Sequence, residues 1–409
     1  MLDLRAIARD PDPVREALAR RRDGSDERLM QALAVRERLN AVKTELGDAQ
    51  AARNAGAKAI GEAKRKGEDA SAAIAEMQAV SARVKELEPE KDRLEAEFEA
   101  LNASLPNPPL ESAADEDTPL RHWGDPRPDG KDHLELAGAM IDMEAGSRTS
   151  GSRFAYLKGD LVILELALVR WVMEILRGHG FEPTIPPVLV REQALFGTGF
   201  LPDTEQQIYR LADDPLYLVG TSEVPLASLH AGEIMDALPR RYAGFSPCFR
   251  REAGAAGKDT RGIFRVHQFD KVEMFSFVEP SASVEEHERL LSIEEEILQG
   301  LEIPYRVVNI AVDDLGSSAA KKYDLEAWLP SQQRYRELTS TSNTTDFQAR
   351  RLDIRHRPGG GKPEHVHTLN GTAVAVGRTL IALLENHQDE SGVVVPAVLR
   401  EWGAPERLG

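Results

Sequence analysis

The chain has 409 residues, 41% of them hydrophobic and 29% charged, and its formal net charge is −17. This composition excludes a disordered chain, and the negative balance excludes nucleic-acid binding by a positive field spread over the whole surface, so any RNA contact must use local basic clusters. The single cysteine, Cys248, excludes an intrachain disulfide and a multi-cysteine zinc site, and we interpret it as a small buried hydrophobic residue.

The N-terminal segment predicts no targeting signal. Residues 1–21 carry three aspartates and no uninterrupted apolar stretch, so we expect a cytoplasmic protein. The most apolar segment, residues 161–176, is broken by two glutamates and one arginine. It therefore predicts a buried helix and no membrane span.

Two heptad patterns within about residues 26–105 predict two long helices, because side chains at alternating steps of four and three form a coiled-coil seam. Residues 64–69 lie between the patterns and hold Gly67 within a cluster of charges, so we expect the chain to reverse there into an antiparallel hairpin. The seam positions are Val35, Leu39, Val42, Leu46 and Ala49, and then Met77, Val80, Val84, Leu87, Lys91, Leu94, Phe98, Leu101 and Leu105.

A hairpin of this length reaches beyond a compact domain, since a helix of about 35 residues spans roughly 50 Å. Pro89 removes one backbone hydrogen bond from the second helix. Because the seam continues in phase on both sides, we expect a kink there and no helix end. Taken alone, the hairpin fits a dimerising coiled coil as well as an arm that reaches for a large partner.

Composition divides the chain into a helical arm (residues 1–105), a linker rich in proline and acidic residues (106–132), and a remaining domain (133–409). In that domain strand-like segments cluster without regular helices between them, which predicts the α+β class with an antiparallel β-sheet flanked by helices. The strand-like segments are 265–277 and 305–311, and the helical ones are 161–177, 284–298 and 372–386.

Charged side chains gather around a loop of small residues that two strand-like runs flank. Side chains two apart on a strand share one face, so Arg250 and Glu252 point one way, as do Phe269, Lys271 and Glu273. A guanidinium, an aromatic ring and carboxylates on one face suit a nucleotide triphosphate together with an amino-acid ammonium. By general rules alone, a solvated hairpin with surface charge pairs remains the alternative.

This stretch resembles motif 2 of the class II aminoacyl-tRNA synthetases, in the form found in the seryl-tRNA synthetase family of bacterial type. The resemblance covers essentially the whole chain, and its departures keep small side chains: Ser222 for alanine, Thr372 for serine, and Thr339 and Thr341 for small residues. The other matching segments are Thr221–Leu226 (T-A-E-V-P-L), Arg336–Asn343 (R-E-(I/V)-(S/T)-S-x-S-N), His367–Thr372 with Gly377–Thr379 (motif 3), and Phe181–Pro187 (motif 1), where Pro187 is expected at a dimer interface.

The resemblance implies which residues act on ATP. Arg250 would bind the α-phosphate and the substrate carboxylate, Arg378 the γ-phosphate, and Phe269 would stack on adenine. Glu337 and Ser340 would supply oxygen ligands to the Mg²⁺ that accompanies ATP. The implied catalytic residues are Arg250, Glu337 and Arg378, and the implied ATP contacts are Arg250, Arg251, Glu252, Val266, Phe269, Glu337, Leu338, Thr339, Ser340 and Arg378.

The resemblance also implies which residues enclose the substrate, L-serine. Hydrogen bonds to its hydroxyl from Glu273 and Thr372 would leave buried polar groups unpaired when alanine binds, whereas threonine must be excluded by shape. The implied serine contacts are Thr221, Ser222, Glu223, Arg250, Glu273, Asn343 and Thr372.

The implied reaction is ATP-dependent formation of seryl-adenylate and transfer of serine to the 3′ end of tRNA(Ser), with tRNA(Sec) as a second candidate. A homodimer is implied, together with Mg²⁺ and no zinc, and no membrane partner. The hairpin would grip the tRNA, with Arg53, Lys58, Lys64, Arg65 and Lys66 as candidate contacts. Lys258 and Arg261 of the motif 2 loop would touch the acceptor end.

Three alternatives belong to other classes of protein. A catalytically dead paralogue with a binding role would lack Arg250, Glu273, Glu337 or Arg378, and all four are present. A ligase that loads an amino acid onto a carrier protein would lack the long hairpin. A purely structural coiled coil would not need the motifs of the last two-thirds of the chain.

Overall fold

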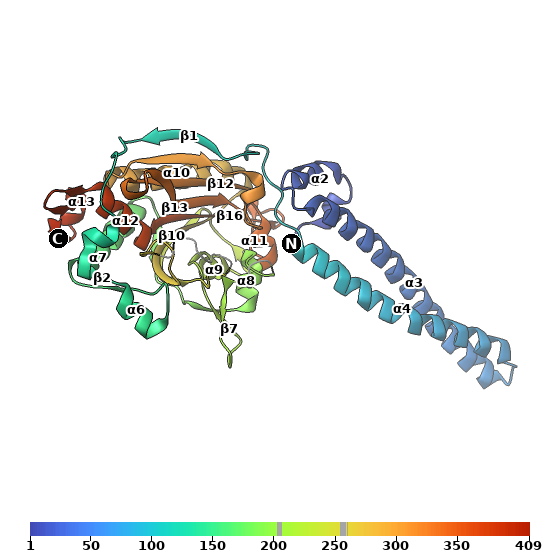
Figure 1. Ribbon diagram of the computed structural model, residues 1–409. Helices are drawn as coiled ribbons and strands as arrows, with labels where there is room; N and C mark the ends of the chain where they lie inside the picture. The colour runs from blue at the N-terminus through green and yellow to red at the C-terminus, as the bar shows by residue number, and fades with distance from the viewer. Residues whose placement is uncertain (203–206, 254–258, 260) are drawn as a thin grey trace. The chain divides into compact units, whose positions relative to one another are not determined.

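The computed structural model describes residues 1–202, 207–253, 259 and 261–409 (Figure 1). The chain forms two compact units, Met1–Leu105 and Pro106–Gly409. The first unit is helical, and the second is built around a β-sheet.

Two long helices, α3 (Ser25–Lys66) and α4 (Ser71–Ser104), lie side by side in the first unit (Figure 1). Leu87 and Leu94 between them are fully buried, and burial of one leucine side chain contributes about 1.5–3 kcal/mol to stability. The predicted antiparallel hairpin is therefore confirmed. Its buried seam consists of Val35, Leu39, Val42, Leu46, Val84, Leu87 and Leu94.

The reversal lies at Gly67, where the sequence predicts it. This glycine has φ 77°, a left-handed conformation that a side chain would strain, and the N–H of Glu68 donates to the carbonyl of Ala63 at 3.0 Å. Pro89 lies inside α4, so the prediction that the helix does not end there is confirmed. Two short helices, α1 (Leu4–Ile7) and α2 (Asp12–Ala19), precede the hairpin and were not predicted from the sequence.

An eight-stranded sheet of described residues organises the second unit, and its neighbouring strands run antiparallel except for the parallel pair β4 and β9. The predicted α+β class with an antiparallel sheet is confirmed. Within residues 106–132, expected to form a linker, β1 pairs with β11 at one edge of the sheet. In spatial order the strands are β1 (Thr118–Trp123), β11 (Tyr305–Asn309), β12 (Lys321–Leu329), β13 (Arg334–Asn343), β16 (His367–Ala375), β10 (Gln268–Val278), β9 (Arg240–Phe249) and β4 (Glu182–Thr184).

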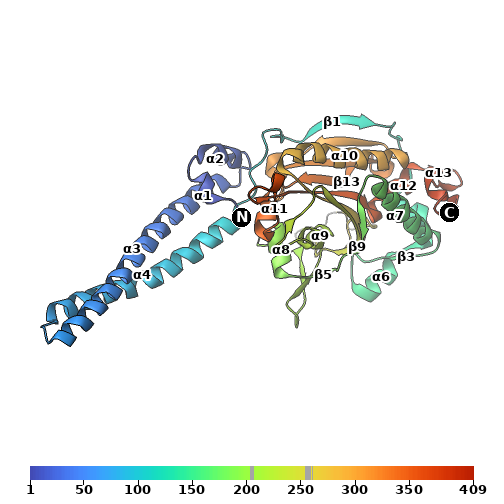
Figure 2. The same ribbon diagram turned by 180° about the vertical axis from the view of Figure 1, so that it is seen from behind.

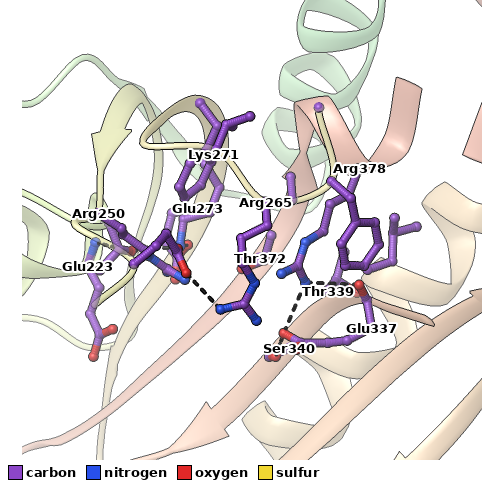
Figure 3. A pocket seen from close by; sticks show the side chains of 18 of the residues that line it. Glu223, Arg250, Arg265, Lys271, Glu273, Glu337, Thr339, Ser340, Thr372 and Arg378 are labelled. Atoms are coloured by element: carbon purple, nitrogen blue, oxygen red, sulfur yellow. Dashed lines mark hydrogen bonds and ion pairs between the residues drawn. The ribbon is translucent and has the colours of Figure 1, made fainter. Parts of the chain in front are cut away.

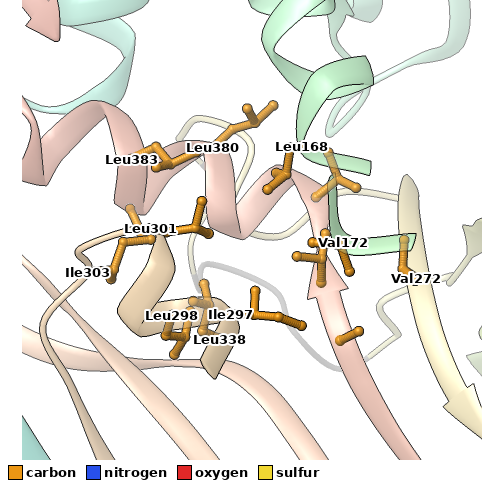
Figure 4. Close-up of a cluster of buried hydrophobic side chains, with 14 of the residues drawn as sticks. Leu168, Val172, Val272, Ile297, Leu298, Leu301, Ile303, Leu338, Leu380 and Leu383 are labelled. Carbon is orange, nitrogen blue, oxygen red and sulfur yellow. The ribbon is translucent and has the colours of Figure 1, made fainter. Parts of the chain in front are cut away.

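Helices α7 (Asp160–Gly178), α10 (Ser283–Gly300) and α12 (Val376–Asn386) pack on the sheet, and Figure 2 shows α7 and α10 in front of the strands. Their apolar side chains meet those of β10 and β13 in one core (Figure 4). Val272 and Met274 of β10 are fully buried in this core. The alternate residues of β10 therefore face the other side of the sheet.

The sequence analysis placed the start of the last long helix wrongly. Residues 372–375, expected to be helical, belong to β16, because this strand pairs with β10 on one side and β13 on the other. Tertiary strand pairing overrides the local helical pattern there, and α12 begins only at Val376.

Smaller elements complete the second unit, and none of the described helices is long and apolar enough to cross a membrane. The short helices are α5 (His133–Ala137), α6 (Met143–Ser150), α8 (Glu192–Thr198), α9 (Glu223–Ser228), α11 (Phe347–Leu352) and α13 (Ala397–Arg400). The short strands are β2 (Ile141–Asp142), β3 (Tyr156–Leu157), β5 (Leu189–Arg191), β6 (Tyr209–Arg210), β7 (Leu216–Leu218), β8 (Ile234–Met235), β14 (Arg355–His356), β15 (Glu364–His365), β17 (Gln388–Asp389), β18 (Gly392–Val394) and β19 (Arg407–Leu408).

Candidate active site

A pocket in the second unit collects ionisable side chains from several elements (Figure 3). Strands β10, β13 and β16 contribute residues, as do the starts of α9 and α12 and the segment after β9. The pocket combines four basic with four acidic side chains, although the chain as a whole is strongly acidic. These side chains are Arg250, Arg265, Lys271 and Arg378, and Glu223, Glu252, Glu273 and Glu337.

One end of the pocket, which we name the α9 end, is lined by Thr221, Glu223, Lys271, Glu273 and Thr372. A close approach between α9 and β9 positions it. A Cβ on Gly244 would lie 2.7 Å from Leu226 Cδ1, so only glycine lets the helix pack this closely on the strand. Glu273 of β10 pairs in register with Gly244 on one side and with Thr372 of β16 on the other. Cross-strand partners have Cβ atoms about 5 Å apart, so Glu273 and Thr372 can contact the same small ligand.

Buried charges mark the α9 end. The Lys271 ammonium donates to Thr221 Oγ1 at 2.7 Å and forms an ion pair with Glu273. Both charged side chains are buried, and a buried pair requires further polar partners to offset the loss of water. This end therefore suits a small, strongly polar ligand.

Glu223 is the second carboxylate of the α9 end. Its Oε1 accepts hydrogen bonds from Gln348 Nε2 at 2.7 Å and from Asn370 Nδ2 at 3.0 Å. Burial, together with the charge of Glu273, raises the pKa of Glu223 to about 7. A cationic ligand would favour the ionised form, so the site is matched to an amine.

The opposite end, which we name the α12 end, is built around Glu337 of β13 and Arg378 in the first turn of α12. Arg378 Nη1 donates to the Glu337 carbonyl at 2.9 Å and lies 3.4 Å from the Glu337 carboxylate. Burial opposes ionisation of Glu337, but the charges of Arg378 and Lys322 outweigh it and hold the pKa of this carboxyl below its usual value. The N-terminus of α12 adds positive potential, so this end suits phosphate groups.

Arg250 lies beside Glu223 in Figure 3, and its charge acts on the carboxyl of Glu223 and on that of Glu337 at the other end of the pocket. Its Nε donates to the carbonyl of Gly220 at 3.2 Å, and its guanidinium carbon lies 5.3 Å from the ring centroid of Phe269. Nearby, Arg265 Nη1 forms an ion pair with Glu252 Oε2 at 2.7 Å. These cations can neutralise negative charge that bridges the ends of the pocket.

Most of the site residues predicted from the sequence line this pocket. On β10 the side chains of Phe269, Lys271 and Glu273 share the pocket face, as their alternation predicts. Arg250 and Glu252 also line the pocket, but they follow the end of β9 at Phe249 and do not lie on a strand. The predicted residues that line it are Thr221, Glu223, Arg250, Glu252, Val266, Phe269, Glu273, Glu337, Leu338, Thr339, Ser340, Thr372 and Arg378.

Three predicted residues lie elsewhere. Ser222 lies toward β9, where its hydroxyl is hydrogen-bonded to that of Ser246 at 2.8 Å. Asn343, at the end of β13, is fully buried and donates to the carbonyl of Ser283 at 3.2 Å. Arg251 follows Arg250 directly and is exposed.

Three further pocket residues with polar side chains were not assigned to the site: Arg265, Lys271 and Asn370. Strand alternation had placed Lys271 on the face of Phe269 and Glu273, although without a role, and it could also have found Asn370, two residues before Thr372. Arg265 precedes β10, and no sequence pattern indicates its direction.

Two residues expected at the acceptor end belong to the loop between β9 and β10. Lys258 lies outside the described residues. Arg261 forms an ion pair with Asp132 at 2.9 Å, and its side chain is largely exposed.

Cys248, on β9, is fully buried as predicted, and burial raises the pKa of its thiol.

Comparisons with known proteins agree along the whole chain. The family model described as "tRNA synthetase class II core domain (G, H, P, S and T)" matches residues 208–387, and the one described as "Seryl-tRNA synthetase N-terminal domain" matches residues 1–109. The serine–tRNA ligase of Nocardia farcinica is 49% identical over 98% of this chain and 97% of its own length.

Solved structures give the same result. Seryl-tRNA synthetase from Pyrococcus horikoshii, complexed with ATP, superposes with a TM-score of 0.92 at 40% identity and covers 100% of this chain and 99% of its own. The cytoplasmic serine–tRNA ligase of Naegleria fowleri, in complex with AMP, superposes with a TM-score of 0.85 at 32% identity over 98% of this chain and 95% of its own.

Proposed function

The chain belongs to the seryl-tRNA synthetase family, and we propose that its pocket joins serine to ATP and passes the resulting seryl group to tRNA(Ser). The observation that carries the proposal is the distribution of charge in the pocket. The buried carboxylate Glu223 lies at the α9 end, Arg378 lies beside Glu337 at the α12 end, and the charge of Arg250 acts on the carboxyls at both ends. The activity is that of a serine–tRNA ligase of class II.

Serine occupies the α9 end in this proposal. The Glu223 carboxylate accepts from the substrate ammonium, and Arg250 binds the substrate carboxylate. Glu273 and Thr372, paired across strands, bond the substrate hydroxyl. Alanine leaves these buried groups unpaired, which supports discrimination of several orders of magnitude.

ATP occupies the remainder of the pocket, with adenine on the Phe269 ring, Glu252 at the adenine amino group and the γ-phosphate on Arg378. A serine carboxylate oxygen attacks the α-phosphorus in line, the bond to pyrophosphate breaks, and seryl-adenylate forms. Arg250 offsets the negative charge that the two substrates bring together, so the chain acts by positioning and neutralising.

The α12 end also fits the Mg²⁺ that accompanies ATP. The Glu337 carboxylate and the Ser340 hydroxyl lie 3.4 Å apart, and the neighbouring cations keep Glu337 ionised. Carboxylate and hydroxyl oxygens are ligands that this hard cation accepts. Bound there, Mg²⁺ would neutralise phosphate charge.

Transfer follows when the 3′-hydroxyl of the terminal tRNA adenosine attacks the seryl carbonyl and AMP leaves. We assign residues 133–409 as the catalytic domain and residues 1–105 as the arm that binds tRNA. A hairpin whose helices have 42 and 34 residues offers a surface long enough for RNA, and Lys64, Arg65 and Lys66 are exposed near its tip. tRNA(Sec) is a second candidate acceptor.

A homodimer is the proposed assembly, working in the cytosol where ATP and tRNA are available. Apolar side chains on α7 and the following segment support it, since Leu166 is 58% exposed and Ile185, two residues before Pro187, is 83% exposed. Large apolar side chains this exposed cost free energy in water unless a partner covers them. Sedimentation of a monomer at micromolar concentration would contradict the dimer.

Aminoacylation tests the proposed function. The full chain, incubated with ATP, Mg²⁺ and labelled serine, is expected to charge a tRNA(Ser) transcript and to leave a transcript for another amino acid uncharged. Charging of tRNA(Sec) is measured in parallel. Failure to attach serine to tRNA(Ser), with the protein folded and ATP bound, would contradict the proposal.

A further inference from the structure

Gln348 of α11 is fully buried and contacts the α9 end of the pocket without lining it. Its Nε2 donates to Glu223 Oε1 at 2.7 Å and to the carbonyl of Thr198 at 3.3 Å. An amide that donates to a carboxylate stabilises the ionised form of that carboxylate. The Gln348 side chain therefore contacts Glu223, the proposed amine-binding group, without lining the pocket.

The groups around Gln348 fix which way its amide faces. On one side, Oε1 accepts from the Thr368 hydroxyl at 2.9 Å. On the other side, Nε2 faces the Glu223 carboxylate and the carbonyl of Thr198, which only accept hydrogen bonds, so a flipped amide would set its oxygen against both. The network thus admits one orientation, with the NH₂ group toward Glu223.

Asn370 supplies a second amide to the same oxygen, since its Nδ2 donates to Glu223 Oε1 at 3.0 Å. Two donors on Oε1 hold the carboxylate against rotation. Because both amides donate to Oε1, the oxygen of Glu223 that can accept from a ligand in the pocket is Oε2.

We propose that Gln348 is a positioning residue for amine recognition, which holds the Glu223 carboxylate turned so that Oε2 meets the ammonium of serine. The inference rests on the proposed function and adds to it a residue that does not touch the substrate. Because Gln348 lies at the α9 end, its loss should weaken serine binding and leave ATP binding unchanged.

Gln348→Met tests this role, because methionine keeps the volume of the side chain and removes both hydrogen-bonding groups. In ATP–pyrophosphate exchange with the full chain, the KM for serine is expected to rise about tenfold or more, as for loss of a hydrogen bond to a charged group. The KM for ATP and kcat at saturating serine should stay within about threefold. The acidic limb of kcat/KM for serine should move to higher pH, since Glu223 loses a donor that favours its ionised form.

Gln388→Met is the matched control. Gln388 is also buried, and its amide bonds the backbone of Lys131 and Glu385, away from the pocket. A similar loss of thermal stability is expected there, with the KM for serine unchanged.

The outcomes separate the two proposals. If the wild-type chain gives no serine-dependent exchange, the proposed function fails. If the wild type is active and Gln348→Met leaves the KM for serine and the pH limb unchanged, the positioning role fails. Should Gln348→Met not fold, Thr368→Val decides, because it keeps the side-chain shape and removes the hydroxyl bonded to Gln348 Oε1, which loosens the amide that holds Glu223. A severalfold rise in the KM for serine supports the role, and no rise overturns it.

Discussion

In the proposed reaction, Arg250 offsets the negative charges of the serine carboxylate and the ATP α-phosphate. Its guanidinium lies near the Phe269 ring and close enough to Glu223 and Glu337 to influence both carboxyls. A planar cation with several donors can bind a carboxylate and a phosphate at once, which the point charge of lysine cannot reproduce.

Replacing Arg250 measures this contribution. Arg250→Ala is expected to lower kcat/KM for pyrophosphate exchange by about two to three orders of magnitude, with the fold intact by circular dichroism. Arg250→Lys should recover only part of the loss, because the charge returns without the paired donors. A folded Arg250→Ala variant with near-normal exchange would refute the role.

Glu223 predicts a pH dependence of serine binding. Its pKa is raised to about 7, so the carboxyl of the free enzyme becomes neutral as the pH falls below that value and then cannot neutralise the serine ammonium. We expect kcat/KM for serine to fall about tenfold per pH unit below pH 7 and to level off above it. Glu223→Gln should lower the plateau and remove this limb, and an unchanged limb in that variant would assign it to another group.

Strand alternation predicted that Phe269, Lys271 and Glu273 share one face, and all three line the pocket. The family resemblance supplied Thr372 correctly, but it also assigned Ser222 and Asn343, whose hydroxyl and amide groups are hydrogen-bonded elsewhere. Arg265 was missed because it precedes β10, where alternation does not apply. The contact of Gln348 with Glu223 could not be predicted, because it joins α11 to α9 and β16, which are remote in sequence.

Among the elements, the hairpin of α3 and α4 was predictable in detail. Its heptad seam is local in sequence, and Gly67 supplies the left-handed turn. The order of strands in the sheet was not predictable, because pairs such as β13 with β16 and β1 with β11 join residues far apart in the chain. The pairing of β16 also explains why α12 starts later than its local pattern predicts.

Removal of the first unit, residues 1–105, tests the division of labour between elements. Because residues 106–409 form a compact unit with the whole pocket, serine-dependent pyrophosphate exchange is expected to stay within about threefold of the full chain. Charging of tRNA(Ser) should fall by at least two orders of magnitude, since phosphate contacts supply much of RNA affinity. Equal loss of both activities by a folded fragment would contradict this division.

Over the whole molecule, a net charge of −17 and binding of a polyanion are compatible because the cations are placed locally. The pocket gathers four basic side chains against four acidic ones, and exposed basic residues lie at the reversal of the hairpin. Long-range attraction contributes little to such recognition, so shape and a few contacts must select the tRNA.

The central claim is that this chain activates serine, and pyrophosphate exchange with each amino acid in turn tests it most directly. The full chain is incubated with ATP, Mg²⁺, labelled pyrophosphate and one amino acid at a time, without tRNA. Serine should give exchange at least about a thousandfold more efficient than alanine, because alanine leaves Glu273 and Thr372 without the substrate hydroxyl. Exchange that depends on a different amino acid, with none for serine, would contradict the account.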